Sequence, residues 1–356
     1  MKTAFIAWTP LHLINILNVY QNFYRESKGD LFIYSEFENA RRYSERIKEL
    51  GLFNDVVFVN QRKIGSSFKR KINLLTNHNQ FFSDDLSVYD EIFIQGENYF
   101  TKILFSNVYK KNPDVKLNYI EDGLGTYLKK SIFSTSKNIQ RVFKILNKNS
   151  IFKKKIDDYF VYCPELLLYD VKNIKKIPKI DENSKLMKNI QSIFGIEEVF
   201  VGDKCIFFDQ PLLSDGYGID ETDIFAKVNS IFSGKKETLI KLHPRARTNR
   251  YGEKNILNSS LPFEVLLLEN DFSSTLLISP ISTISFSPSM MFEKTINSIM
   301  LAKLILNEYT ALSEDKKETL TNIVLFCEQY NRLSEEKILL PENWAELRKL
   351  VEYGII

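Results

Sequence analysis

Short apolar runs alternate with helix-like segments along most of this 356-residue sequence. Lys2–Trp8 precedes a helical pattern over Pro10–Phe23, and Asp30–Ser35 precedes a charged amphipathic pattern over Glu38–Leu50. Further runs of strand length lie at 55–60, 91–95, 115–120, 159–163, 204–208, 238–242, 263–268, 275–279 and 299–304. Because parallel strands need crossover helices that cover both faces of their sheet, the alternation predicts an α/β fold of the doubly wound class.

The length predicts two domains, since a domain usually takes roughly 100 to 200 residues. We expect an N-terminal domain at 1–185 and a C-terminal domain at 186–335, with a helix at 336–356 packing back on the first. The connection falls late in 157–194, a stretch rich in lysine and interrupted by prolines. The predicted architecture is two doubly wound domains facing a central cleft.

The composition indicates a folded protein in a reducing compartment. Hydrophobic residues make up 44% and aromatic residues 13%, which excludes a largely disordered chain. Cys163, Cys205 and Cys327 lie far apart and outside any CxxC spacing, so neither a disulfide framework nor a zinc site is predicted. The net charge of +3 is too small to indicate nucleic-acid binding. No apolar run approaches the roughly 20 residues of a membrane span, so we expect a cytoplasmic protein.

A carboxylate pair follows the strand predicted at 115–120. Glu121 and Asp122 precede Gly123, whose permissive backbone allows a sharp turn and the close approach of a ligand. Neighbouring side chains of a strand point to opposite faces, so one carboxylate should face the ligand edge of the sheet. We favour Asp122 as a base with Glu121 as its support. The alternative is a turn in which Asp122 accepts only local hydrogen bonds.

A histidine precedes a proline after the strand predicted at 238–242. Pro244 forces His243 toward an extended backbone. An imidazole beside a phosphate is driven toward its cationic form and can then donate to a leaving oxygen. Further positive charge for an anionic ligand comes from Lys241, Arg245, Arg247 and Arg250. The alternative is a structural His-Pro pair.

The segment 278–289 is rich in hydroxyl groups and precedes a helix predicted from about Pro288. Ser282 and Thr283 can present donors to a phosphate, although such residues also serve only as helix caps. The sequence contains no GxxxxGK[ST], GxGxxG or HExxH motif and no convincing DxD site. Group transfer without a metal or other cofactor is therefore predicted.

The segment 129–155 contains nine basic residues and no acidic one. Within it Ile139, Val142, Phe143 and Leu146 recur at helical spacing. The pattern predicts a basic amphipathic helix, which either packs on the core with a solvated outer face or contacts an anionic membrane surface or glycolipid.

At these residues the sequence resembles the bacterial sialyltransferases, whose three shared motifs occur here in the same order. The motifs are Glu121-Asp122-Gly123, His243-Pro244 and Ser282-Thr283. The longer segment 121–127 is similar to lipooligosaccharide and capsular sialyltransferases, particularly glycosyltransferase family 52 and the polysialyltransferases. The segment 262–266 is a further local match to the marine and Pasteurella-type enzymes.

The resemblance implies a GT-B fold of two Rossmann-like domains, CMP-sialic acid as donor, inversion and no metal. It assigns Asp122 as the base, His243 to the leaving phosphate, and Glu264 to the nucleotide ribose. Ser282 and Thr283 would bind the phosphate. Asp209 is a rival base, because some lipooligosaccharide enzymes place the base after the first strand of the C-terminal domain. The predicted donor site also includes Gly123, Gln210, Pro211, Lys241, Pro244 and Arg245, and the acceptor side includes Thr9 and His12.

The implied reaction moves sialic acid to a terminal galactose of a lipooligosaccharide or capsule, with a 2,3 linkage. Alternatives are another nucleotide-sugar or polyol-phosphate transferase of this fold, including a polysialyltransferase, and a non-catalytic subunit of a polysaccharide assembly complex. The expected partners are CMP-sialic acid and a galactose-terminated glycan or glycolipid, with a homodimer as a further option. The expected location is cytoplasmic, at the inner face of a bacterial membrane through 129–155.

Overall fold

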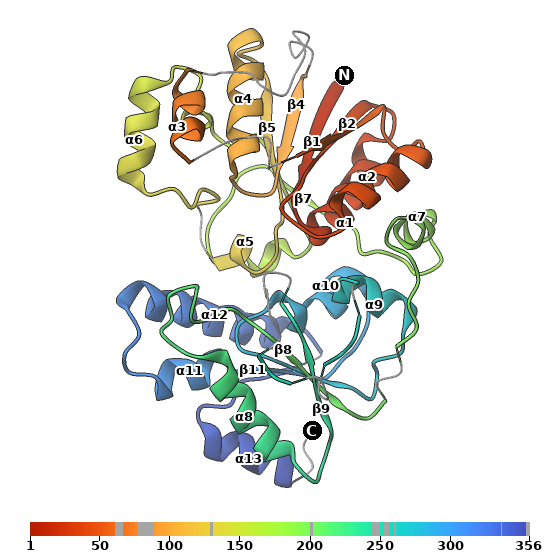
Figure 1. Cartoon of the computed structure of the whole chain (residues 1–356), viewed down its shortest axis with the longest axis vertical. Coiled ribbons are helices and arrows are strands. Elements are labelled where there is room, and N and C mark those ends of the chain that lie inside the picture. The colour runs from red at the N-terminus through yellow and green to blue at the C-terminus, as the bar shows by residue number, and fades with distance from the viewer. Residues whose placement is uncertain are drawn as a thin grey trace. The chain divides into compact units, whose positions relative to one another are not determined.

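The structure is a computed structural model of residues 1–356, and it describes 1–60, 67–76, 89–128, 131–199, 202–243, 250–252, 256–259, 261–335 and 337–353. The chain forms two compact units. The first comprises 1–164 and 170–195, and the second comprises 165–169 and 196–356. Each unit has its own parallel sheet, shown in Figure 1.

The sheet of the first unit has seven parallel strands in the order β3-β2-β1-β4-β5-β6-β7. The strands are β1 Lys2–Ala7, β2 Lys28–Tyr34, β3 Asp55–Val59, β4 Glu91–Ile94, β5 Lys116–Ile120, β6 Tyr159–Val161 and β7 Ile174–Lys176. The central strands are apolar on both faces because helices cover both sides of the sheet.

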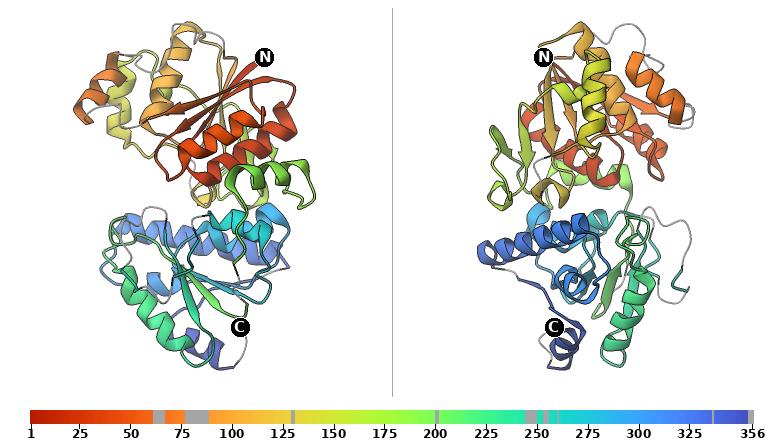
Figure 2. Two further views of the ribbon diagram at one scale, coloured as in Figure 1. Left: turned by 45° about the vertical axis from the view of Figure 1, so that its right-hand side comes forward. Right: turned by 90° about the vertical axis from the view of Figure 1, so that its left-hand side faces the viewer.

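The helices of the first unit lie on opposite faces of this sheet (Figure 2). They are α1 Pro10–Val19, α2 Ala40–Glu49, α3 Ser67–Thr76, α4 Tyr99–Lys111, α5 Gly125–Leu128, α6 Lys137–Leu146 and α7 Lys185–Phe194. Phe5 of β1 packs against Tyr20, which follows α1, whereas its neighbour Ile6 packs in the cluster under α4. This alternation of side chains along β1 separates two hydrophobic layers.

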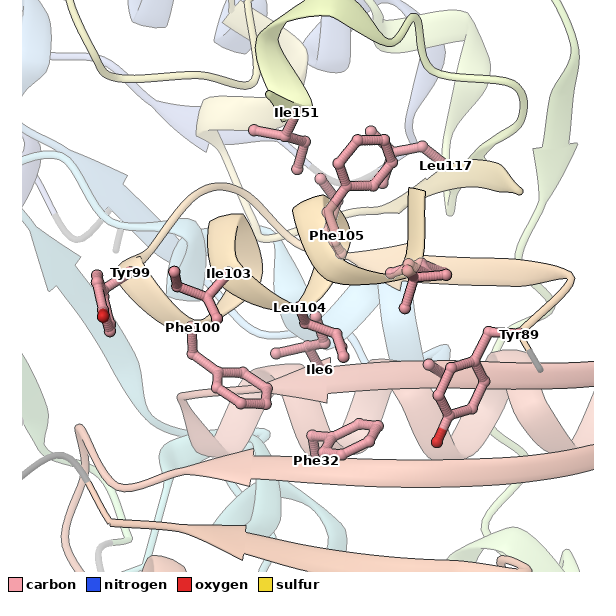
Figure 3. Close-up of a cluster of buried hydrophobic side chains, with 14 of the residues drawn as sticks. Ile6, Phe32, Tyr89, Tyr99, Phe100, Ile103, Leu104, Phe105, Leu117 and Ile151 are labelled. Carbon is pink, nitrogen blue, oxygen red and sulfur yellow. The ribbon is translucent and has the colours of Figure 1, made fainter. Parts of the chain in front are cut away.

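The larger layer lies between α4 and the sheet (Figure 3). Phe100 and Leu104 of α4 point toward Ile6 and Phe32, and all four side chains are buried. Burial of each such side chain contributes roughly 1.5 to 3 kcal/mol relative to exposure. The packing of α4 against the sheet therefore holds the carboxyl ends of the strands in place.

The sheet of the second unit has five parallel strands in the order β12-β11-β10-β8-β9. The strands are β8 Cys205–Phe208, β9 Thr238–Lys241, β10 Leu276–Ser279, β11 Ser298–Met300 and β12 Ile338–Leu339. The helices are α8 Glu221–Phe232, α9 Phe263–Glu269, α10 Ser287–Phe292, α11 Ala302–Glu308, α12 Glu314–Leu333 and α13 Trp344–Glu352. Two Rossmann-like units of this kind are the GT-B fold class predicted from the sequence.

The limits of the two units differ from the domains expected at 1–185, 186–335 and 336–356. Helix α7 belongs to the first unit because Phe194 packs on Tyr43 of α2 and Arg46 donates to the Ile193 carbonyl at 2.7 Å. The C-terminal residues belong to the second unit, where Lys227 of α8 lies over the Trp344 ring of α13.

In each sheet the strand order reverses at one point, so that the strands added before and after it lie on opposite sides of the starting strand. Ligands of such folds bind at the carboxyl ends of the strands at this reversal. The point lies between β1 and β4 in the first unit and between β8 and β10 in the second. Among the residues that the structure describes, no helix is long and apolar enough to cross a membrane.

Candidate functional site

Glu121 of the first unit is a buried carboxylate directly after β5. It is 3% exposed, and its Oε2 accepts a hydrogen bond from the Tyr127 hydroxyl at 2.5 Å and from the Tyr162 amide at 2.9 Å. Burial raises the pKa of Glu121 to about 7, with a smaller contribution from the charge of Asp122, although the two hydrogen bonds oppose the rise. Glu121 therefore supports the loop from inside the unit.

Asp122 is exposed, in contrast to its neighbour. Its Oδ1 accepts hydrogen bonds from the Tyr119 hydroxyl at 3.1 Å and from the Thr126 hydroxyl at 3.0 Å. The next residue, Gly123, has a φ of +107°, a left-handed conformation that favours glycine and turns the chain. The loop thus presents a carboxylate of fixed orientation at the surface of the unit.

Gly96 brings the end of β4 beside this carboxylate. A Cβ atom added at Gly96 would lie 3.6 Å from Asp122 Oδ2 and 3.5 Å from the Trp8 ring. Trp8 follows β1, so three strand ends meet here, including those of β1 and β4 at the strand-order reversal. Gly96 was not among the predicted site residues. Trp8 begins the turn 8–12 after the first strand, which was expected on the acceptor side through Thr9 and His12.

Thr9 and His12, predicted for the acceptor side, build the turn that holds Trp8. The Thr9 hydroxyl caps α1 by accepting from the His12 amide at 3.2 Å. The Trp8 amide donates to His12 Nδ1 at 3.4 Å, and the two rings meet edge to face. Burial lowers the pKa of His12 to about 3, so the ring is neutral near pH 7.

His243 and Asp209 lie at the carboxyl ends of neighbouring strands of the second unit. Asp209, after β8, is 5% exposed, and its Oδ2 accepts from the His243 amide at 3.3 Å. Its Oδ1 accepts from the Tyr251 hydroxyl at 2.5 Å. Burial and this bond raise the pKa of Tyr251 above its usual range. Both oxygens of Asp209 are thus engaged in holding the loop that carries His243.

Lys241, which is half-buried, and Glu264, which is buried, lie next to this loop, and each is affected by the charge of the other. Lys241 Nζ donates to the Ser259 carbonyl at 2.6 Å, and burial lowers the pKa of Lys241 to about 8, opposed by the charges of Glu197 and Glu264. Burial raises the pKa of Glu264, opposed by the charge of Lys241. Ser259 also donates to Glu197 at 2.9 Å. Shifted pKa values of this kind are common at functional sites, so the two residues are candidates for ligand contact.

The hydroxyl segment forms a tight turn after β10. The Ser282 hydroxyl accepts from the Ile284 amide at 3.3 Å and begins the short 3-10 helix Thr283–Ser285, followed by α10. Gln210 and Pro211 follow Asp209 at the end of β8, next to β10 in the sheet. The fold therefore brings Asp209, Gln210, Pro211, Lys241, His243, Ser282 and Thr283 to one edge of the second sheet.

The predicted residues fall into two groups, one in each unit. Glu121, Asp122, Thr9 and His12 belong to the first, together with Gly123, which was predicted for the donor site. The other described residues of the predicted donor site belong to the second. Pro244, Arg245 and Arg247 lie outside the described residues. Arg250 was predicted for an anionic ligand, but it pairs with Asp220 at 3.5 Å and with Glu221. Tyr251 was missed, since nothing in its local sequence distinguishes it.

The sequence matches a family model described as alpha-2,8-polysialyltransferase (POLYST) over residues 4–286, which is most of the chain and includes both groups. The chain belongs to the alpha-2,8-polysialyltransferase family. This polysialyltransferase-family protein is accordingly a glycosyltransferase of the sialyltransferase class, and the predicted resemblance is confirmed at that level. A search of curated protein sequences found no match.

Solved structures similar to the polysialyltransferase-family chain include UDP-GlcNAc 2-epimerase of Methanocaldococcus jannaschii in complex with UDP-GlcNAc and UDP. The TM-score is 0.55 at 14% identity, over 99% of this chain and 92% of that one. The glycosyltransferase of kitacinnamycin has a TM-score of 0.51 at 11% identity, over 99% and 90%. Both likenesses concern the fold alone.

A third similar structure is the 2,6-sialyltransferase of Photobacterium sp. JT-ISH-224, solved with CMP and lactose. The TM-score is 0.49 at 13% identity, over 97% of this chain and 78% of that one.

Proposed function

We propose that the protein transfers sialic acid from CMP-sialic acid to a sugar hydroxyl at the end of a surface glycan. The observation that carries this proposal is the exposed Asp122 carboxylate, held at Oδ1 by two hydroxyl donors at a sheet edge where ligands of such folds bind. A positioned carboxylate of this kind can accept the proton of an attacking hydroxyl. Membership of a polysialyltransferase family supports the choice of sialic acid.

In the proposed reaction, the acceptor oxygen forms a bond to the anomeric carbon of sialic acid while the bond from that carbon to the CMP phosphate oxygen breaks. The acceptor proton passes to Asp122, and CMP leaves with the electron pair. One displacement inverts the anomeric centre. We propose that it needs no metal, because cationic and hydroxyl groups of the second unit can stabilise the departing phosphate.

Asp122 is a better candidate for the base than Asp209. Asp209 is almost fully buried, and its two oxygens accept from the Tyr251 hydroxyl and the His243 amide. An attacking hydroxyl would have to reach an oxygen of Asp209 that is almost fully buried and already accepts a hydrogen bond. Asp122 is exposed, so an attacking hydroxyl can reach it. We therefore propose that Asp209 positions His243.

His243 and the hydroxyl turn are proposed to bind the leaving phosphate. Asp209 fixes the His243 backbone, and we propose that the His243 ring donates to the phosphate as negative charge develops. Ser282 and Thr283 begin a turn whose hydroxyl and amide groups can add donors. Lys241 and Glu264 would meet the nucleotide, together with Gln210, Pro211, Gly123, Pro244 and Arg245.

Two acceptors are proposed. The sequence resemblance to lipooligosaccharide enzymes favours a terminal galactose with a 2,3 linkage. The family description favours a terminal sialic acid with a 2,8 linkage, that is, chain extension.

The test is incubation of the protein with CMP-sialic acid and either lactose or a 2,8-linked disialyl-lactoside, with the product linkage read by NMR. Release of CMP coupled to a new sialyl linkage on either acceptor supports the proposal, and the acceptor used distinguishes its two forms. Retained activity after treatment with a chelator supports metal independence. Turnover of a different activated sugar, or tight binding of CMP with no transfer to either acceptor, would contradict the proposal.

A further inference from the structure

Helices α3 and α6 lie side by side at one side of the first unit, as the views of Figures 1 and 2 show. They are joined where α6 ends, because the buried Asn147 side chain donates to the Leu74 carbonyl of α3 at 2.8 Å. Two segments more than 60 residues apart in the sequence therefore share one surface.

Helix α6 turns its apolar side chains outward. None of its residues is buried, and the exposed fractions are 51% for Ile139, 51% for Val142, 79% for Ile145 and 58% for Leu146. Phe143 is the side chain that faces the unit, against Phe152. The predicted apolar stripe of Ile139, Val142, Phe143 and Leu146 is therefore divided. Phe143 packs against the unit, and the other three side chains are exposed.

Helix α3, which lies beside α6, also exposes two large apolar side chains. Phe68 is 71% exposed and Ile72, one turn later, is 43% exposed. The other side of α3 is anchored by Asn73, which donates to the Tyr99 hydroxyl at 3.0 Å. Six of the fifteen exposed large hydrophobic side chains found among the described residues therefore belong to these two helices.

The charge on this surface is of one sign. Neither 67–76 nor 123–156 contains an acidic residue. Exposed basic side chains are contributed by Lys71, Lys137, Arg141, Lys144 and Lys148. Within the part of the chain that the structure describes, Lys137, Arg141, Lys144 and Lys148 form no ion pair. The surface therefore carries positive charge and exposed apolar groups together.

We propose that α3 and α6 form a docking surface for an anionic lipid bilayer. Apolar side chains flanked by basic ones are the combination that inserts into the headgroup region while the charges contact anionic lipids. A soluble polyanion would use the lysines and leave Ile145 and Phe68 in water. A second copy of the chain would present the same positive charge and be repelled. The inference goes beyond sialic acid transfer and does not depend on it.

The test is co-sedimentation of the full chain with vesicles of phosphatidylcholine, with or without phosphatidylglycerol. We expect binding only to the anionic vesicles, weakened by salt. The variant Val142→Ser/Ile145→Ser and the variant Arg141→Glu/Lys144→Glu should each weaken partitioning about tenfold or more. Controls in the second unit are Leu325→Ser/Leu333→Ser and Lys235→Glu. These variants also change exposed side chains, and they should bind as the wild type does.

A second readout reports insertion directly. A fluorophore on Ile145→Cys, in a Cys163→Ser background, should shift to the blue with anionic vesicles, while one on Leu333→Cys should not. Equal binding by Val142→Ser/Ile145→Ser and the wild type, with loss only in the charge reversal, would indicate a polyanion site and overturn the proposal. Self-association abolished by the apolar variant, without vesicle binding, would also overturn it.

Discussion

The Tyr127 hydroxyl donates a 2.5 Å hydrogen bond to Glu121, and both side chains are buried. The Cys163 amide in turn donates to the Tyr127 hydroxyl at 3.3 Å, so the pair ties the loop after β5 to the end of β6. Asp122, the proposed base, is the next residue of the same loop. The buried carboxylate therefore sets the position of the exposed one.

Glu121 should make the stability of the protein depend on pH. Its pKa is raised from 4.5 to about 7 in the folded state, so the folded protein holds a proton that the unfolded chain releases between these values. The free energy of unfolding should therefore fall as pH rises from about 4.5 to about 7, by on the order of 3 kcal/mol. Glu121→Gln stays neutral throughout and should lack this fall, as measured by urea unfolding across the pH series.

Asp55→Asn removes an exposed carboxylate of the same unit and serves as the control for the loss of one carboxylate. Identical pH profiles for Glu121→Gln and the wild type would show that the buried carboxylate does not hold its proton.

Asp122 and Asp209 should respond differently to the same substitution. Asp122→Asn should lower kcat by about 10²- to 10⁴-fold, because the base is lost while the Tyr119 and Thr126 hydroxyls still have an acceptor. Asp209→Asn should lower the free energy of unfolding by about 1 to 3 kcal/mol, since an amide cannot accept at both positions. The kcat of Asp209→Asn should fall less than that of Asp122→Asn. The reverse order of kcat values would assign the base to Asp209.

The alternation of apolar runs was enough to predict most of the two sheets, because buried parallel strands have a strong local signal. β1, β5 and β8 lie within a residue or two of the predicted runs. β7 and β12 were not predicted, and the apolar run 263–268 forms helix α9 rather than a strand. β7, with the sequence Ile-Lys-Lys, is an edge strand with only one neighbour, so no second row of apolar side chains is required.

The candidate site was predictable where it follows strand ends and not where it depends on tertiary contacts. Asp122, His243 and Ser282 could be found because each follows an apolar run. The pairing of Asp209 with Tyr251, 42 residues later, could not, because no local pattern links two strand-end loops. That the apolar side of α6 is exposed could not be predicted either, since the spacing of apolar residues does not show which side of a helix packs on the core.

His243 should matter more to the chemical step than to donor binding. If its ring stabilises charge that develops on the leaving phosphate, His243→Ala should lower kcat by about 10²- to 10³-fold and change the dissociation constant of CMP-sialic acid little. His78→Ala, which removes another of the three histidines, is the control. Steady-state kinetics and calorimetric titration give the two quantities, and a loss confined to affinity would remove His243 from the chemical step.

Lys241 should make CMP affinity depend on pH above neutrality. Its pKa is lowered to about 8, so the free protein loses this charge as pH rises through 8, whereas a bound phosphate would keep it protonated. Affinity should then fall by up to about tenfold per pH unit above 8, in a range where the phosphate no longer titrates. Lys241→Arg keeps its charge and should bind CMP equally at pH 7 and 9. Lys235→Arg, an exposed change in the same unit, should follow the wild type. Titration calorimetry at both pH values measures the difference, and parallel profiles for the wild type and Lys241→Arg would show that Lys241 does not contact the phosphate.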